Sequence, residues 1–327
     1  MNLPPHRLTY GLLMLACVAT AAILLAGLCG ATGCSIPAST SDVLWQLRMP
    51  RALSAFAVGA SLSLAGALMQ LLLRNPLADP YVLGVSGGAA AGALGLTWFI
   101  PASLMTYGLH VGSLAGALLA TVLLFGLASP ELISRRQRLS DAQPGLRLIL
   151  TGVMIAAGSG ALITLLLSLS DDIHLRGVLF WLMGDLDASE LLWPVWLTLM
   201  LAVVWSLRNA SSLNVLAHGE LTAFLVGVST RQLRVMTLLV AATTTAAAVS
   251  VAGTIGFVGL VVPHAMRLLI GNDQRVLLPS AALVGGAALC LADLVARSIV
   301  APVQLPVGVI TSLVGVPVFL FLLTRSR

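Results

Sequence analysis

Residues 74–92 read RNPLADPYVLGVSGGAAAG and join two long apolar runs. Pro76 and Pro80 stand four residues apart, so no continuous helix can pass through both, because proline lacks an amide hydrogen and restricts the residue before it. Asn75-Pro76 is a pair that commonly starts a turn. The stretch therefore predicts a tight turn between two apolar helices, and the glycines that open the second helix allow a close neighbour.

The composition indicates a protein whose solvent is largely lipid. Of the 327 residues, 58% are hydrophobic and only 9% are charged, whereas soluble domains carry about 25% charged residues. The sequence contains no lysine, so it cannot hold the G-x-x-x-x-G-K phosphate loop, and any ATP hydrolysis must belong to another chain. The net charge of +5 is scattered and forms no basic face for nucleic acid.

Apolar runs long enough to cross a bilayer, about 20 residues each, recur along the whole chain. We expect an all-α polytopic membrane protein with about ten transmembrane helices and a single transmembrane domain over residues 1–327. Gly253 and Gly256 are the best division between two spans that nearly run together. The predicted spans are roughly 8–29, 51–73, 81–100, 111–128, 147–169, 191–207, 235–252, 256–270, 279–298 and 306–324.

The arginines fix the expected orientation of these spans. With the N-terminus inside, thirteen arginines fall on the inner side and four on the outer side. Cytoplasmic loops carry the excess of basic residues in membrane proteins, so this distribution places both chain ends in the cytoplasm. The four outer arginines are Arg48, Arg51, Arg176 and Arg297.

Two segments between spans have an amphipathic pattern. The outer segment 170–190 predicts a short helix that lies on the outer surface. The inner segment 208–234 places Leu221, Phe224 and Leu225 at helical spacing beside Glu220. The pattern fits a docking surface for a soluble partner and an idle helix on the membrane equally well.

Few residues have the pattern of a chemical site. His174, in the outer segment, is a candidate contact for an arriving substrate, although a surface histidine usually has no such role. The histidines have no metal-binding spacing, and no catalytic constellation is legible, so we expect neither a bound cofactor nor enzymatic activity. Cys29 and Cys34 would pair only if both face an oxidising compartment.

Asp293 is a carboxylate deep in a late apolar run. Arg297 follows one helical turn later, so an ion pair at the helix end is the favoured interpretation. A secondary transporter driven by protons or sodium would be expected to carry more buried acids, and this alternative class has little support in the sequence.

Three long blocks resemble one known family. They are RMPRALSAFAVGASLSLAGALMQLLLRNPLADPYVLGVSGGA (48–89), GTIGFVGLVVPHAMRLLIGNDQRVLLP (253–279) and LADLVARSIVAPVQLPVGVITSLVGVPVFLFLL (291–323). In this order they resemble the FecCD family, the membrane permeases of ABC importers for iron chelates, haem and vitamin B12.

The resemblance implies a permease of a type II ABC importer in the bacterial inner membrane. A second copy would complete a homodimer, two separate ATPase subunits would use ATP, and a periplasmic binding protein would deliver the substrate. Haem is the first expectation for that substrate, with vitamin B12 and a ferric siderophore as alternatives.

The resemblance also implies roles for individual residues. The inner segment 213–227 would couple to the ATPase, and the outer arginines would dock the binding protein. The implied positions are Glu220, Leu221, Phe224, Leu225 and Gly227 for coupling, Asn75, Leu77, Pro144 and Gly145 for the cytoplasmic gate, and Arg48, Arg51 and Arg297 for docking.

Overall fold

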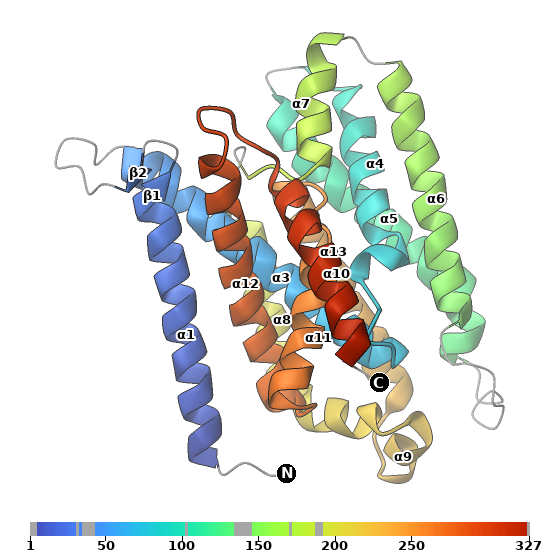
Figure 1. The fold of residues 1–327 in the computed structure, drawn as a ribbon. Helices are drawn as coiled ribbons and strands as arrows, with labels where there is room; N and C mark the ends of the chain where they lie inside the picture. Colours follow the sequence, from blue (N-terminus) through green and yellow to red (C-terminus); the bar gives the residue numbers. More distant parts are fainter. Residues whose placement is uncertain are drawn as a thin grey trace.

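The computed structural model is a bundle of apolar helices, most of which run along a common direction (Figure 1). It describes residues 5–30, 33–34, 43–101, 104–133, 146–169, 172–186 and 192–325. The N-terminal end of α1 (Pro5–Leu28), the C-terminal end of α13 (Val307–Arg325) and the short helix α9 (Glu220–Leu225) all lie in the lower half of Figure 1. This shared end is the one for which the arginines predict a cytoplasmic location.

Ten apolar helices of the described residues correspond one to one with the ten predicted spans. Seven are long enough to cross a membrane by themselves, and three are shorter. The remaining helices of these ten are α3 (Met49–Leu73), α4 (Val85–Thr97), α5 (Met105–Ile133), α6 (Leu146–Ser168), α8 (Trp193–Ala217), α10 (Thr230–Ala252), α11 (Val258–Ile270) and α12 (Gln274–Ser298).

The predicted end of the sixth span at residue 207 is wrong, because α8 continues for ten further residues to Ala217. The polar residues of this extension have partners that lie far away in the sequence. The Asn214 side chain donates to Asp273 Oδ1 at 2.7 Å and accepts from the Gln274 amide at 2.8 Å. These bonds cap the start of α12 and stabilise the extra turns of α8 against it.

Helix α3 lies at the centre of the bundle and contacts α1, α8, α10, α11 and α12. Its alanines, serines and glycines are nearly all buried, and this small-residue surface lets neighbouring backbones approach closely. A side chain at Gly59 would collide with the carbonyl oxygen of Gly285 on α12, and one at Gly66 would collide with that of Gly259 on α11. The centre of the bundle therefore combines close backbone contact with large buried side chains such as Leu62, Leu68 and Met69.

The predicted outer helix exists as α7 (Asp172–Leu182), but it does not lie flat on the surface. It runs along the upper part of the bundle in Figure 1, and its last turns are buried, with Val178 and Trp181 each 6% exposed. Trp181 packs against Ala90 and Ala93 of α4. An amphipathic pattern fits a groove between helices as well as a membrane surface, which explains the wrong prediction.

The outer end of α1 leads into a short hairpin. Strands β1 (Cys29–Gly30) and β2 (Gly33–Cys34) pair in antiparallel fashion, and Cys29 and Cys34 form a disulfide bond. Disulfides persist in oxidising compartments such as the periplasm. The hairpin therefore supports the orientation predicted from the arginines.

Candidate functional site

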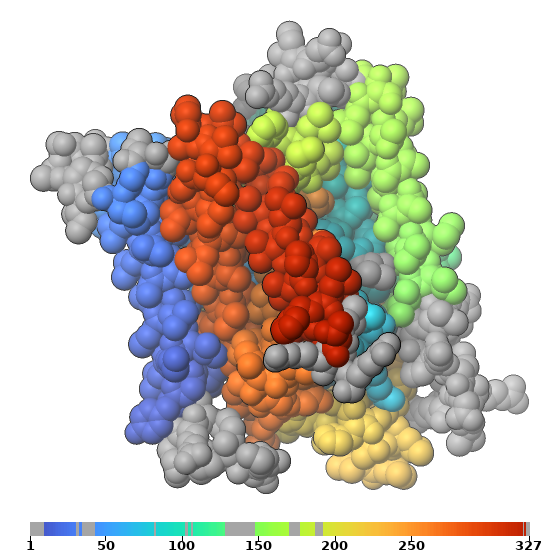
Figure 2. All heavy atoms as spheres, viewed as in Figure 1, coloured from blue at the N-terminus to red at the C-terminus, as the bar shows by residue number. Residues whose placement is uncertain are grey.

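The inner end of the bundle carries an exposed apolar surface on α9. Ala223 is fully buried and anchors this helix, whereas Leu221, Phe224 and Leu225 are 55%, 52% and 75% exposed. Together with Val226, which is 68% exposed, they form a surface that we call the α9 apolar cluster (Leu221, Phe224, Leu225 and Val226). Figure 2 shows the yellow region that holds α9 at the lower margin of the molecule.

Contacts to α10 hold α9 in place. Glu220 forms an ion pair with Arg234 of α10 at 2.8 Å. The chain leaves α9 through Gly227, whose φ of +88° belongs to the left-handed region that glycine adopts without strain. The amide of Val228 then donates to the carbonyl of Ala223 at 2.9 Å. The apolar cluster is therefore presented on a fixed support rather than on a free loop.

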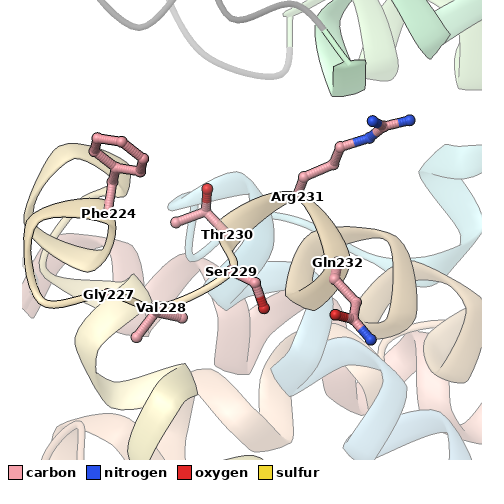
Figure 3. Close-up of a pocket in the computed structure, with 7 residues that line it drawn as sticks. All are labelled: Phe224, Gly227, Val228, Ser229, Thr230, Arg231 and Gln232. Carbon is pink, nitrogen blue, oxygen red and sulfur yellow. The ribbon is translucent and has the colours of Figure 1, made fainter.

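A groove of about 370 Å³ lies between α9 and the first turn of α10. Figure 3 shows the Phe224 ring and the Arg231 guanidinium on opposite sides of it. An apolar wall with a charged rim is typical of a surface that receives a protein partner. The lining residues are Phe224, Gly227, Val228, Ser229, Thr230, Arg231 and Gln232.

The turn after α3 has the chemistry that its sequence predicts. Arg74 ends the helix in the left-handed conformation, with φ of 48°. The Asn75 side-chain oxygen accepts from the Leu77 amide at 2.9 Å, and the Asn75 carbonyl accepts from the Ala78 amide at 3.0 Å. Asparagine commonly makes such turns with its own side chain. Leu77 stands at the tip and is 42% exposed.

Asp79 and Tyr81 close this turn and were not identified from the sequence as functional candidates. The Asp79 carboxylate accepts from the Tyr81 amide at 2.9 Å and caps the short helix η2 (Pro80–Leu83). Burial raises the pKa of Asp79 to about 6, and the bond from Tyr81 offsets part of that rise. The phenol oxygen of Tyr81 accepts from the amide of Ile255, between α10 and α11, at 2.6 Å.

The outer end holds a buried ion cluster of three side chains. Arg51 Nη2 lies 2.9 Å from Asp293 Oδ1, and Arg297 Nε lies 2.9 Å from Asp293 Oδ2. Asp293 is fully buried, and Arg51 and Arg297 are only 8% and 5% exposed. The predicted pair between Asp293 and Arg297 is confirmed, and Arg51 is a third member that the sequence did not reveal.

The arginines expected to dock the binding protein also have internal partners. Arg51 and Arg297 both bond to Asp293, and Arg297 also donates to the carbonyl of Ala26 on α1 at 3.0 Å. Arg48 is less buried, and it donates to the carbonyl of Leu28 at 3.1 Å. These bonds give the arginines a structural role, and their docking role stays a prediction.

Three of the predicted site positions cannot be placed in the structure. Pro144 and Gly145 lie outside the described residues, and so does the side chain of His174. Among the residues that were described, no group of three or more His, Cys, Asp or Glu side chains could hold a metal ion.

Ten apolar helices, a charged cluster within the bundle and an exposed apolar helix at one end define a multi-pass membrane protein. Comparison with known proteins then identifies the family: residues 8–325 match the FecCD transport family. The chain therefore belongs to the FecCD transport family. As a member of it, the chain is an ABC transporter permease, which is not itself an enzyme.

Several similar proteins are known. The hemin transport system permease protein HmuU of Yersinia pestis is 42% identical over 304 residues, which cover 88% of this chain and 86% of the relative. The vitamin B12 import system permease protein BtuC of Vibrio cholerae is 39% identical over 289 residues, which cover 88% and 84% of the two chains. A solved structure, described as an inward-facing conformation of a metal-chelate type ABC transporter, is 30% identical with a TM-score of 0.81 and covers 98% of this chain and 100% of its own.

Proposed function

We propose that this chain forms, with a second copy of itself, the pathway of a type II ABC importer in the bacterial inner membrane. A periplasmic binding protein delivers the substrate at the outer end, and two ATPase subunits bind the inner end. The observation that carries this proposal is the α9 apolar cluster, an exposed apolar surface on a fixed helix at the end where the chain termini lie.

The absence of lysine from the sequence supports a separate ATPase, because a phosphate-binding loop of the P-loop type needs one. In the proposed complex, Leu221, Phe224 and Leu225 insert into a cleft of the ATPase, and the groove beside Arg231 accepts a projecting side chain from it. The Asn75–Leu77 turn is the proposed cytoplasmic gate of each subunit.

We propose haem as the substrate. The support is the 42% identity with a hemin permease, and the competing support is the 39% identity with a vitamin B12 permease. Both molecules are large metal-containing macrocycles, so a pathway wall of small, uncharged residues suits either one better than a bare ion, which needs rings of charges or carbonyl oxygens.

The test is ATP hydrolysis by the reconstituted complex in the presence of binding proteins loaded with haem, vitamin B12 or a ferric siderophore. We expect the haem-loaded protein to stimulate hydrolysis most strongly. Stimulation by vitamin B12 or the siderophore alone would replace haem and keep the importer assignment. Transport by the purified chain down an ion gradient, without any ATPase, would support a secondary transporter instead.

A further inference from the structure

The chain between α10 and α11 is not helical, although it lies inside a bundle of apolar helices. Residues 253–257 separate the two helices, and the break begins at Gly253, with φ of 65°, and ends at Phe257, with φ of 68°. Backbone amides and carbonyls that are buried in an apolar surrounding need partners, because no water is present to bind them. The partners of this break come from two different regions of the molecule.

The first region is the end of α7. The hydroxyl of Thr254 donates to the carbonyl of Leu182, and the amide of Asp185 donates to the carbonyl of Ala252 at 3.0 Å. Gly253 lies directly against the carbonyl of Trp181, where any side chain would collide. The break and the end of α10 therefore hold the inserted end of α7 by one side-chain bond and one backbone bond.

The second region is the turn that follows α3. The Ile255 amide donates to the phenol oxygen of Tyr81 at 2.6 Å. Tyr81 is itself fixed by two hydrogen bonds of its backbone. Its amide donates to the Asp79 carboxylate at 2.9 Å, and its carbonyl accepts from the Gly84 amide at 3.1 Å. A rigid aromatic side chain thus joins the turn near the inner end to the break that holds α7.

The inner side of this turn lies near the start of α9. A Cβ placed on Gly219, the residue that precedes α9, would lie 3.9 Å from Arg74 Nη2. Tyr81 therefore connects a turn that lies near α9 to the break, and the break is bonded to the end of α7.

We propose that Tyr81 is a positioning residue that couples the turn at the inner end to α7 at the outer end. The inference rests on the proposed function, in which an ATPase displaces α9 and the Asn75–Leu77 turn. Movement of that turn pulls on the Ile255 amide through the phenol oxygen, and the break transmits it to Leu182 and Trp181. Mere proximity does not demonstrate coupling, so the test must measure a response at one end to a change at the other.

The experiment measures distances between spin labels in the two copies of the reconstituted complex with its ATPase subunits. Leu77→Cys reports on the turn, and Gly177→Cys reports on α7, where an added Cβ meets nothing within 4 Å. Cys17 and Cys290 are replaced by alanine, because they are the free cysteines among the described residues. Each distance is compared between the nucleotide-free state and the state trapped with ATP and vanadate.

In the wild-type background we expect both distances to change. In Tyr81→Phe, which removes only the accepting oxygen, we expect the Leu77 change to persist and the Gly177 change to be lost. Uptake should fall by about fivefold or more, the lower range of typical couplings, with basal ATP hydrolysis nearly unchanged. Tyr107→Phe is the matched control, since Tyr107 is 58% exposed on α5, and both distance changes should remain.

A second variant distinguishes a loss of coupling from a loss of folding caused by Tyr81→Phe. Thr254→Val removes the bond to Leu182 at the other side of the break, and we expect the same phenotype. The double variant should lose no more uptake than either single variant, because both substitutions interrupt the same proposed coupling between the turn and α7. Two results would overturn the coupling. One is a change in the distance between the labels at residue 177 that is as large in Tyr81→Phe as in the wild type. The other is a loss of uptake in the double variant that equals the sum of the two single losses. A wild-type complex with no change at either label would overturn the proposed function, and the coupling with it.

Discussion

The outer and inner ends of this bundle differ in which side chains are buried and which are exposed. At the outer end, Asp293 and two arginines are buried together, and the neighbouring hairpin is closed by a disulfide bond. At the inner end, the Glu220–Arg234 ion pair is partly exposed, and the four apolar side chains of the α9 apolar cluster are exposed. The two ends differ most in which groups have an internal partner.

The comparison shows that arginines at the outer end have partners inside the bundle, whereas leucines at the inner end are exposed. Arg51 and Arg297 bond to Asp293 inside the subunit, so their charges contribute to the fold. The α9 apolar cluster is exposed, and Ala223 is the buried residue of this helix. The surface that most requires a partner is therefore at the inner end.

The largest expected effect comes from breaking the outer cluster. Asp293→Ala strands two arginines in a buried site and should cost about 3–5 kcal/mol of stability. The matched inner-end change is Glu220→Gln, whose ion pair is partly exposed and should cost about 0.2–1 kcal/mol. Thermal unfolding in detergent compares the two variants. Equal losses would contradict the contrast between the two ends.

Asp79 is the exception at the inner end, a buried carboxylate in the gate turn. Its pKa is raised from 3.8 to about 6, so the folded state binds the proton more tightly than the unfolded state. Stability should therefore fall as the pH rises through this range and stay level above it. Asp79→Asn keeps the cap and removes the charge, so it should stabilise the protein at pH 7.5 by about 3 kcal/mol.

Unfolding temperatures measured from about pH 4 to 8 check this prediction. The change of unfolding temperature with pH in this range is attributed to the Asp79 carboxylate. The Asn variant should lack the decrease that the wild type has in this range. A wild-type stability that rises with pH through the range would mean that the carboxylate has a favourable partner, and the assignment of its raised pKa to burial would be wrong.

Removal of the α9 apolar cluster should affect transport rather than folding. The double variant Phe224→Ala with Leu225→Ala should reduce ATP-driven uptake by about tenfold, since central apolar residues carry most of an interface's binding energy. Its unfolding temperature should change little, because both side chains are more than half exposed. Leu119→Ala is the control, as Leu119 is 62% exposed on α5, away from the inner end.

The smallest expected effect concerns Arg48, the least buried of the three arginines predicted to dock the binding protein. Exposed ion pairs are worth about 0.2–1 kcal/mol, so Arg48→Glu should slow association modestly and mainly at low salt. Stopped-flow association rates at two salt concentrations provide the measurement. A rate that equals the wild type at low salt would leave Arg48 with its bond to Leu28 as a purely structural residue.

The sequence predicted the helices well because long apolar runs leave few alternatives in a lipid-like solvent. It also predicted the break at Gly253, the turn at Asn75 and the short helix α9, since each depends on residues that are neighbours in the chain. It did not predict Arg51 as a partner of Asp293, because the two are 242 residues apart.

The same reason explains the other errors. Asn214 extends α8 only because its partners, Asp273 and Gln274, begin a helix about sixty residues later. Helix α7 enters the bundle because a groove exists beside α4, and an amphipathic pattern does not record whether its apolar face meets lipid or protein. The role of Tyr81 likewise depends on Ile255, which lies 174 residues away.

The central claim is that a separate ATPase drives transport through contact with α9. The most direct measurement is uptake of haem by proteoliposomes that contain the chain, its ATPase subunits and the loaded binding protein, with and without ATP. We predict that uptake requires ATP, that it persists when all ion gradients are dissipated, and that the Phe224→Ala, Leu225→Ala variant abolishes most of it. Uptake that needs an ion gradient and proceeds without the ATPase would contradict the account.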